Sequence, residues 1–135
     1  MNNRDLTPLH ADGAEFYTLG QILLRGITAF RAYKNQKGWD IICLSNDCSK
    51  EWKVQVKYRT DYRRNNKGGR IKFNTDSNDV LVYIDANAGN ADFNTYAIPK
   101  SDFPNVLTKT NNLTSAVNTL TQYKDRWQAF DGINA

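Results

Sequence analysis

The chain contains a single histidine and two cysteines among its 135 residues. Catalysis by Ser/His/Asp or Cys/His groups requires an imidazole, and the one available is His10, in a polar N-terminal stretch beside Pro8. Structural zinc sites normally use four Cys or His ligands at paired spacing, which Cys43, Cys48 and one distant histidine do not provide. Metal chemistry in this chain must therefore use oxygen ligands, which favour Mg²⁺, Mn²⁺ or Ca²⁺.

Long apolar runs are also scarce. The longest, such as residues 41–44, are far too short to cross a bilayer, and no apolar stretch follows Met1. We therefore expect a cytoplasmic protein without a membrane partner, whose two cysteines are free thiols. A chain of 135 residues with 40% hydrophobic content suits one domain. We expect a flexible tail over residues 1–11 and a single domain over residues 12–135.

The net charge of +4 is distributed unevenly. Residues 50–72 contain nine basic and two acidic side chains, whereas the rest of the chain contains nine basic and twelve acidic ones. Aromatic residues are interleaved with the basic ones: Trp52, Tyr58, Tyr62 and Phe73. This pattern is typical of a surface that contacts nucleic-acid phosphates. From charge alone, a solvated loop that only keeps the protein soluble is an equally good interpretation.

Hydrophobic periodicity predicts a helix, then strands, then a second helix. Residues 12–26 have helical spacing, with Asp12 as N-cap, Gly26 as stop, and an apolar face that includes Glu15, Leu19, Ile22 and Leu23. Strands are predicted at residues 27–33, 39–45, 51–60, 70–73, 80–85 and 93–98. A C-terminal helix is predicted from the stripe Leu113, Ala116, Val117, Leu120, Tyr123, Trp127 and Phe130. This order predicts an α+β (α/β/α) fold around one mixed central sheet.

Four polar side chains come from three of these elements. Glu15 lies on the first helix, Asp40 begins the second strand, and Gln55 and Lys57 lie on the polar face of the third. A hairpin of strands two and three would place Asp40 near Gln55 and Lys57 if these side chains emerge on one face, and a helix across that face would bring Glu15 to them. With the Val56 carbonyl, these oxygens would suit a divalent cation. Lys57 would activate a water molecule or offset charge in the transition state.

Four motifs along residues 13–98 add a resemblance: Gly13-Ala14-Glu15, Leu23-Leu24-Arg25-Gly26, Gly38-Trp39-Asp40-Ile41-Ile42 and Val54-Gln55-Val56-Lys57. Together they resemble the PD-(D/E)XK nuclease superfamily. The chain is most similar to branches, including some homing endonucleases and Holliday-junction-resolvase-like proteins, in which Gln replaces the acidic residue before x-Lys. The resemblance implies a restriction-endonuclease-like core and hydrolysis of DNA phosphodiester bonds with Mg²⁺ or Mn²⁺. It implies catalysis by Glu15, Asp40, Gln55 and Lys57. Together with the Val56 carbonyl considered above, the expected metal ligands are Glu15, Asp40, Gln55 and Val56.

The chain departs from this family pattern at several positions. Trp39 stands where the family has proline, and the neutral Gln55 lowers the affinity of the site for a cation. A basic loop over residues 61–69 replaces the helix that usually follows the third strand. We expect the DNA backbone to be held by Arg59, Arg63, Arg64, Lys67, Arg70 and Lys72. A nuclease of this size would often dimerise to cut both strands, so a homo-oligomer is one of the expected states.

Each motif also has a structural interpretation. Asp12 and Glu15 would form a capping box, Asp40 would belong to the turn after Gly38, and Gln55 with Lys57 would be the solvent face of a half-exposed strand. Two other functions follow from these interpretations. One is a catalytically inactive nuclease fold that binds nucleic acid, and the other is a protein-interacting accessory or immunity factor.

Overall fold

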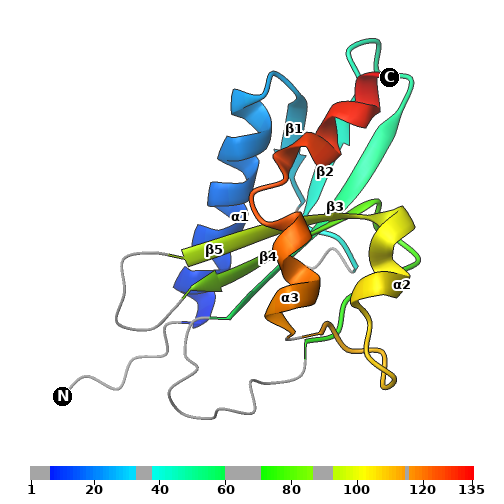
Figure 1. The fold of residues 1–135 in the computed structure, drawn as a ribbon. Coiled ribbons are helices and arrows are strands. Elements are labelled where there is room, and N and C mark those ends of the chain that lie inside the picture. The colour runs from blue at the N-terminus through cyan, green and yellow to red at the C-terminus, as the bar shows by residue number, and fades with distance from the viewer. Residues whose placement is uncertain (1–6, 33–37, 60–70, 87–92, 115) are drawn as a thin grey trace, which may run out of the picture.

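The computed structural model describes residues 7–32, 38–59, 71–86, 93–114 and 116–135 (Figure 1). Five strands follow an N-terminal helix: α1 (Thr7–Leu24), β1 (Thr28–Arg31), β2 (Ile41–Leu44), β3 (Glu51–Arg59), β4 (Val80–Ala86) and β5 (Phe93–Pro99). Short helices complete the chain: η1 (Lys100–Asp102), α2 (Phe103–Val106), α3 (Val117–Leu120), η2 (Thr121–Tyr123) and η3 (Trp127–Asn134). The predicted α+β class with one mixed sheet is confirmed.

The sheet has the order β1-β2-β3-β4-β5, so that neighbours in sequence are neighbours in space. All adjacent pairs are antiparallel except β3 and β4, which are parallel. The predicted hairpin of strands two and three is confirmed, with Ile41 opposite Val54 and Cys43 opposite Trp52. Since side chains alternate along a strand, the even-numbered residues of β3 face one side of the sheet and the odd-numbered residues face the other.

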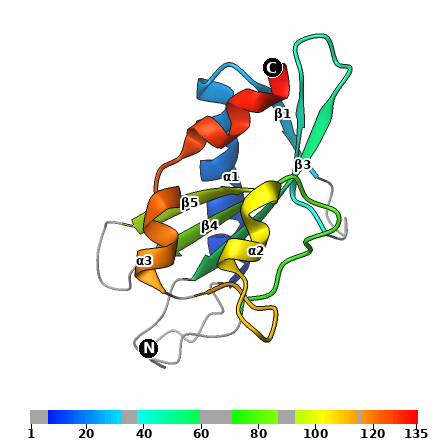
Figure 2. The same cartoon turned by 45° about the vertical axis from the view of Figure 1, so that its right-hand side comes forward.

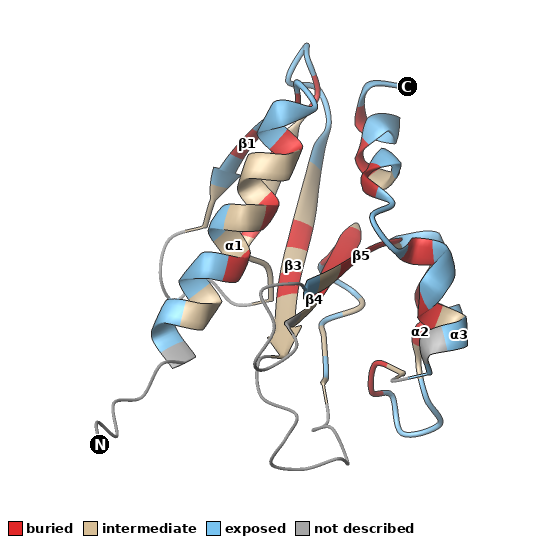
Figure 3. Ribbon diagram, turned by 60° about the vertical axis from the view of Figure 1, so that its left-hand side comes forward, coloured by how far each residue is buried: buried red, intermediate tan, exposed pale blue. Residues whose placement is uncertain are grey.

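A separate apolar core covers each face of the sheet (Figure 2). On one face, α1 and η3 pack on Ala29, Val54 and Val56. On the other face, the segments around α2, α3 and η2 cover β4 and β5 through Leu81, Tyr83, Tyr96, Ile98, Phe103 and Tyr123. Both cores are fully buried at their centres (Figure 3). Among the described residues, this second core does not extend to the β1–β2 end of its face, where Phe30 of β1 is exposed.

Helix α1 is longer than the sequence predicts. It begins at Thr7, so residues 7–11, which we expected in the tail, are helical and Asp12 is not the N-cap. Its most buried side chains are Thr18 and Ile22, whereas Leu23, which the sequence placed on the core face, is exposed. The stop at Gly26 is confirmed, because Gly26 has φ +83° and the Ile27 N–H donates to the Ile22 carbonyl at 3.3 Å.

The predicted single C-terminal helix is wrong. Lys124 pairs with Tyr96 of β5, and the N–H of Asp125, which has φ +53°, donates to the Thr95 carbonyl at 2.8 Å. This crossing of the edge strand interrupts the helix. As a result, Tyr123 belongs to one core and Phe130 to the other. The burial expected for Trp127 and Phe130 is confirmed.

Residues 71–73, part of the strand predicted at 70–73, are not in a strand. Cys43 is buried in the core, where burial raises the pKa of its thiol to about 12. Among the described residues, no helix is long and apolar enough to cross a membrane.

Candidate active site

Glu15 is bound by a residue that we did not predict, Arg31 of β1. The Glu15 Oε1 accepts hydrogen bonds from Arg31 Nε at 3.2 Å and from Arg31 Nη2 at 2.9 Å. The same Nη2 donates to Asp12 Oδ1 at 3.0 Å. Neither carboxylate caps the helix, so the capping-box interpretation is wrong. Since Ala29 faces the α1 core, the alternation of β1 also directs Arg31 to this face, which is the signal in the sequence that would have identified it.

Asp40 lies at the point where the β2–β3 ladder ends. Its N–H donates to the Val54 carbonyl at 2.8 Å, and its carbonyl accepts the Ala32 N–H at 2.7 Å. Beyond this point the Asp40 side chain, instead of a backbone carbonyl of β2, accepts the next hydrogen bond from β3: its Oδ2 accepts the Val56 N–H at 2.7 Å. The N–H and C=O of one strand residue point to the same edge, so the Val56 carbonyl also leaves β3 beside Asp40.

Gln55 and Lys57 lie on the face of β3 opposite to α1, which packs on Val54 and Val56. The expectation that a helix across the face of Gln55 and Lys57 brings Glu15 to them is therefore wrong. Their register partners in β4 are Leu81 and Tyr83, which belong to the second core. The Gln55 Oε1 accepts the Asn74 N–H at 2.8 Å and a longer bond from Asn78 Nδ2 at 3.4 Å. The amide oxygen that we expected to face a cation therefore holds the segment before β4 in this structure.

Lys57 lines a pocket of about 320 Å³ together with Val56, Tyr58, Ile71 and Lys72. One of its lining residues, Val56, donates its N–H to Asp40. A phosphate group could enter this pocket beside Lys57, the predicted catalytic lysine.

The electrostatics of the two carboxylates link these side chains. Burial raises the pKa of Asp40, while the Val56 hydrogen bond and the charges of Lys57 and Arg31 lower it in part. Burial also raises the pKa of Glu15, and the negative charge of Asp40 raises it further, against the opposing effect of the Arg31 hydrogen bond. Asp40 is thus within electrostatic reach of Glu15 on the helix and of Lys57 on the strand.

Asn78 forms hydrogen bonds that hold the turn preceding Asp40. It is buried, and its Nδ2 donates to the carbonyls of Gly38 and Asn74, the latter at 2.7 Å. Gly38 has φ +90°, and a Cβ atom there would lie 3.0 Å from the Asn74 side chain. Asn74, Asn78 and Gly38 therefore fix the approach of the chain to Asp40. The turn at Gly38 was expected from the sequence, whereas sequence patterns gave no indication of Asn74 or Asn78.

The donor set fits a hard divalent cation with retained water molecules. Mg²⁺ is typically bound by one or two carboxylates and keeps several waters. Glu15 and Asp40 supply two carboxylates whose raised pKa values reflect their burial and, for Glu15, the negative charge of its neighbour, and such groups gain from a nearby cation. The described residues contain no group of three or more His, Cys, Asp or Glu side chains that could hold a metal ion, so the Val56 carbonyl or Gln55 would have to complete the set.

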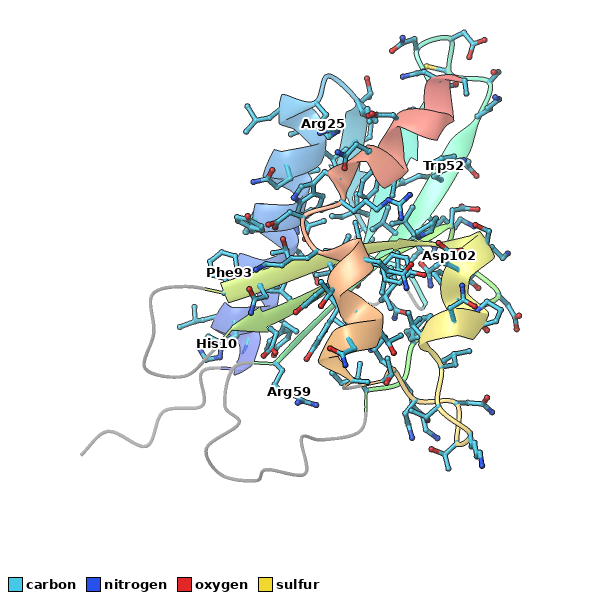
Figure 4. All side chains as sticks on the ribbon, viewed as in Figure 1. His10, Arg25, Trp52, Arg59, Phe93 and Asp102 are labelled. Atoms are coloured by element: carbon cyan, nitrogen blue, oxygen red, sulfur yellow. The ribbon has the colours of Figure 1, made fainter. Side chains whose placement is uncertain are left out.

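Two of the six predicted DNA-binding side chains, Arg59 and Lys72, can be placed. Arg59 ends β3 on the same face as Lys57, opposite Asp85 in the register, and Lys72 lines the Lys57 pocket (Figure 4). The other four, Arg63, Arg64, Lys67 and Arg70, and the loop at residues 61–69 lie outside the described residues. His10 is half-buried, with its ring 6.4 Å from that of Tyr58.

The fold is similar to that of a nuclease. A solved structure, described as that of a bacterial homing endonuclease, I-Ssp6803I, superimposes with a TM-score of 0.59 at 17% sequence identity and covers 92% of each chain. No protein-family model matches the chain, and no curated protein matches it in sequence. The mixed sheet with helices on both faces is therefore a fold that this chain shares with a homing endonuclease.

Proposed function

We propose that the protein is a DNA endonuclease that hydrolyses phosphodiester bonds with Mg²⁺ or Mn²⁺ at a site formed by Glu15, Asp40, Gln55 and Lys57. The observation that carries the proposal is the position of Asp40. Its carboxylate accepts the Val56 N–H at the end of the ladder, the charge of Lys57 lowers its pKa against the effect of burial, and its own charge raises the pKa of Glu15. The shared fold with a homing endonuclease supports the same conclusion.

Each residue then has a distinct role. Asp40 and Glu15 would hold the cation, with the Val56 carbonyl at the same edge, and the cation when bound would supply Lewis-acid activation of water and phosphate. Lys57 would place its ammonium against the negative charge that develops on the phosphoryl group. Gln55 fixes the segment around Asn74 and so orients this strand face. Arg31 would shift its interaction toward Asp12 as Glu15 binds the cation, because it already contacts both carboxylates.

Phosphate binding would extend from the site along β3. Lys57, Arg59 and Lys72 place positive charge on one face, and Arg63, Arg64, Lys67 and Arg70 follow or precede them closely in sequence. Phosphate contacts supply most of the sequence-independent affinity for DNA. Duplex DNA is therefore the proposed substrate class.

The test compares two aspartates that make the same kind of contact with β3. The Asp40 Oδ2 accepts the Val56 N–H at 2.7 Å, and the Asp79 Oδ2 accepts the Lys53 N–H at 2.8 Å. The variants Asp40→Asn and Asp79→Asn each keep an oxygen for this bond. We expect the wild-type protein and Asp79→Asn to nick supercoiled plasmid in Mg²⁺ or Mn²⁺, whereas Asp40→Asn loses about 10²-fold or more in rate.

The same assay separates the alternative functions. Equal cleavage by both variants would refute this site. Salt-sensitive DNA binding by a folded wild-type protein that never cleaves would instead favour the inactive nucleic-acid-binding module. Absence of DNA binding at low salt would favour the protein-interacting factor.

A further inference from the structure

The outer face of α1 is apolar. Leu9, Phe16 and Leu23 are 56%, 55% and 48% exposed and are spaced seven residues apart, so they share one side of the helix. The opposite side carries Ala14, Thr18 and Ile22, which pack on the sheet. Figure 3 shows the exposed residues of α1 on the side turned away from the sheet. A helix that is apolar on opposite sides is normally covered on both.

Two glycines complete this face. Gly13 and Gly20 alternate with the large residues to give the stripe Leu9, Gly13, Phe16, Gly20 and Leu23, which we call the α1 seam. Among the described residues, a Cβ atom at Gly13 or Gly20 would meet nothing within 4 Å, so packing against them does not require glycine at either position. Glycine inside a helix costs about 0.5–1 kcal/mol relative to alanine. The seam is thus shaped for close approach by something outside the described chain.

The chemistry of the seam excludes several occupants. DNA requires positive charge, and the two charged side chains of α1, Asp12 and Glu15, are acidic and bound to Arg31. The segments outside the described residues are mostly polar, and the six residues before α1 contain Met1 and Leu6 as large apolar side chains. The seam from Leu9 to Leu23 spans roughly 21 Å of helix, too long for two such side chains at one end to cover.

We propose that the α1 seam pairs with the same seam of a second copy of this chain. The stripe is almost symmetrical about Phe16, with leucine seven residues away on either side and a glycine three or four residues away. A two-fold interface requires a surface that complements itself, and an antiparallel pair centred on Phe16 sets Leu9 of each copy beside Leu23 of the other. The glycines leave room for the opposing Phe16 ring.

The size of the surface agrees with a dimer of modest affinity. The seam side chains and the neighbouring Leu24, which is 86% exposed, offer apolar area on the order of 400 Å² per copy, about half of the ~800 Å² per partner in a standard interface. The Phe16 ring also lies 4.1 Å from the Arg31 guanidinium, which binds Glu15. Pairing would therefore bring two candidate sites near the two-fold axis, although the pairing itself does not depend on the proposed function.

Sedimentation equilibrium of the full chain tests the proposal. We expect a monomer–dimer equilibrium for the wild-type protein at micromolar to ~100 μM concentrations. Gly20→Leu should weaken the dimer by about tenfold or more, because the added side chain fills the seam, while its Cβ atom meets none of the described residues within 4 Å. Phe30→Glu is the matched control, since Phe30 is also 55% exposed but lies on β1, away from the seam. Thermal unfolding of each variant checks that it folds.

A monomeric wild-type protein over this range would overturn the proposal, as would a dimer that resists Gly20→Leu or that is lost in Phe30→Glu. Cysteine cross-linking tests the geometry in a Cys48→Ser background, because Cys48 is the exposed cysteine. We expect Phe16→Cys to cross-link to itself, and a mixture of Leu9→Cys and Leu23→Cys proteins to cross-link to each other. Self-cross-linking of Leu9→Cys would contradict the antiparallel arrangement.

Discussion

At the scale of single residues, the candidate site is a pair of carboxylates held in an unfavourable state. Burial raises the pKa of both Asp40 and Glu15, and the negative charge of Asp40 raises that of Glu15 further. Arg31 and Lys57 offset this cost without removing it. Such residual electrostatic strain is common where a protein is built to receive a cation or a reacting group.

The raised pKa values predict how stability changes with pH. A group whose pKa is higher in the folded state binds more protons there than in the unfolded chain, so stability falls as pH rises through the interval between the two values. Asp40→Asn removes the contribution of Asp40. We therefore expect the Tm of this variant to rise relative to wild type as the pH increases above the ordinary aspartate pKa of 3.8 in metal-free buffer. Mg²⁺ should reduce the difference, because it stabilises only the wild type.

Thermal unfolding at several pH values, with and without Mg²⁺, checks this prediction. A Tm difference that does not change with pH would contradict it. So would an equal Mg²⁺ stabilisation of the variant and the wild type.

Arg31 offers a second prediction about single residues. Arg31→Ala leaves Asp12 and Glu15 unpaired one turn apart and removes the contact with the Phe16 ring. We expect a loss of about 1 kcal/mol in the free energy of unfolding, measured in denaturant. Arg25→Ala is the control, because Arg25 forms one exposed ion pair with Asp131 at 2.9 Å (Figure 4). An equal or larger loss in Arg25→Ala would show that Arg31 has no special role.

At the scale of elements, the turn at Gly38 determines where Asp40 lies. Gly38→Ala requires alanine at φ +90° and places its Cβ 3.0 Å from the Asn74 side chain. We expect this variant to lose about 1 kcal/mol or more of stability and to cleave DNA more slowly, because the backbone before Asp40 must move. The double variant with Asn74→Ala relieves the contact but not the backbone strain. Full recovery in the double variant, measured by denaturant unfolding, would contradict this explanation.

The elements also show what sequence patterns can and cannot predict. Strand β3 was predictable because its polar and apolar residues alternate, and the β2–β3 hairpin followed from the turn residues between the two strands. The prediction of a single C-terminal helix was wrong because three short helices have the same apolar periodicity as one long helix. The pairing of Lys124 with β5, which interrupts the helix, is a tertiary contact that periodicity does not reveal.

The same limit applies to the site. Glu15, Asp40, Gln55 and Lys57 could be selected from the sequence because each lies at a definite position in a predictable element. The supporting residues Arg31 and Asn78 could not be selected from the sequence, because they act through side-chain contacts between distant segments. The helical phase of α1 was also mispredicted, since Leu23 belongs to the outer face.

At the scale of the whole molecule, the proposed function predicts that DNA binds along one face of β3. The basic segment of residues 50–72 lies on a chain whose remainder is acidic, and Lys57, Arg59 and Lys72 lie at the end of β3 away from the β2–β3 turn. Counterion release makes such binding fall steeply with salt.

We expect duplex DNA binding in metal-free buffer to weaken linearly on a log–log plot against salt concentration. Lys72→Gln should reduce the slope by about 1. Lys100→Gln should leave the slope unchanged. Lys100 follows Pro99, which pairs with Val80 at the start of β4, whereas Arg59 pairs with Asp85 near the end of β4. Fluorescence anisotropy over a salt series measures both slopes. Equal slopes for wild type and Lys72→Gln would remove Lys72 from the DNA-binding surface.

The most direct test of the proposed catalytic site compares the plasmid-nicking rate of Lys57→Ala with that of Lys53→Ala in Mg²⁺. Both lysines belong to β3 and lie on the same face, four residues apart, so the two variants remove the same charge from the same strand. We expect Lys57→Ala to lose about 10²-fold or more in rate, whereas Lys53→Ala stays within a few-fold of wild type. Similar rates for the two variants, in a wild-type protein that cleaves, would contradict a catalytic site at Asp40 and Lys57.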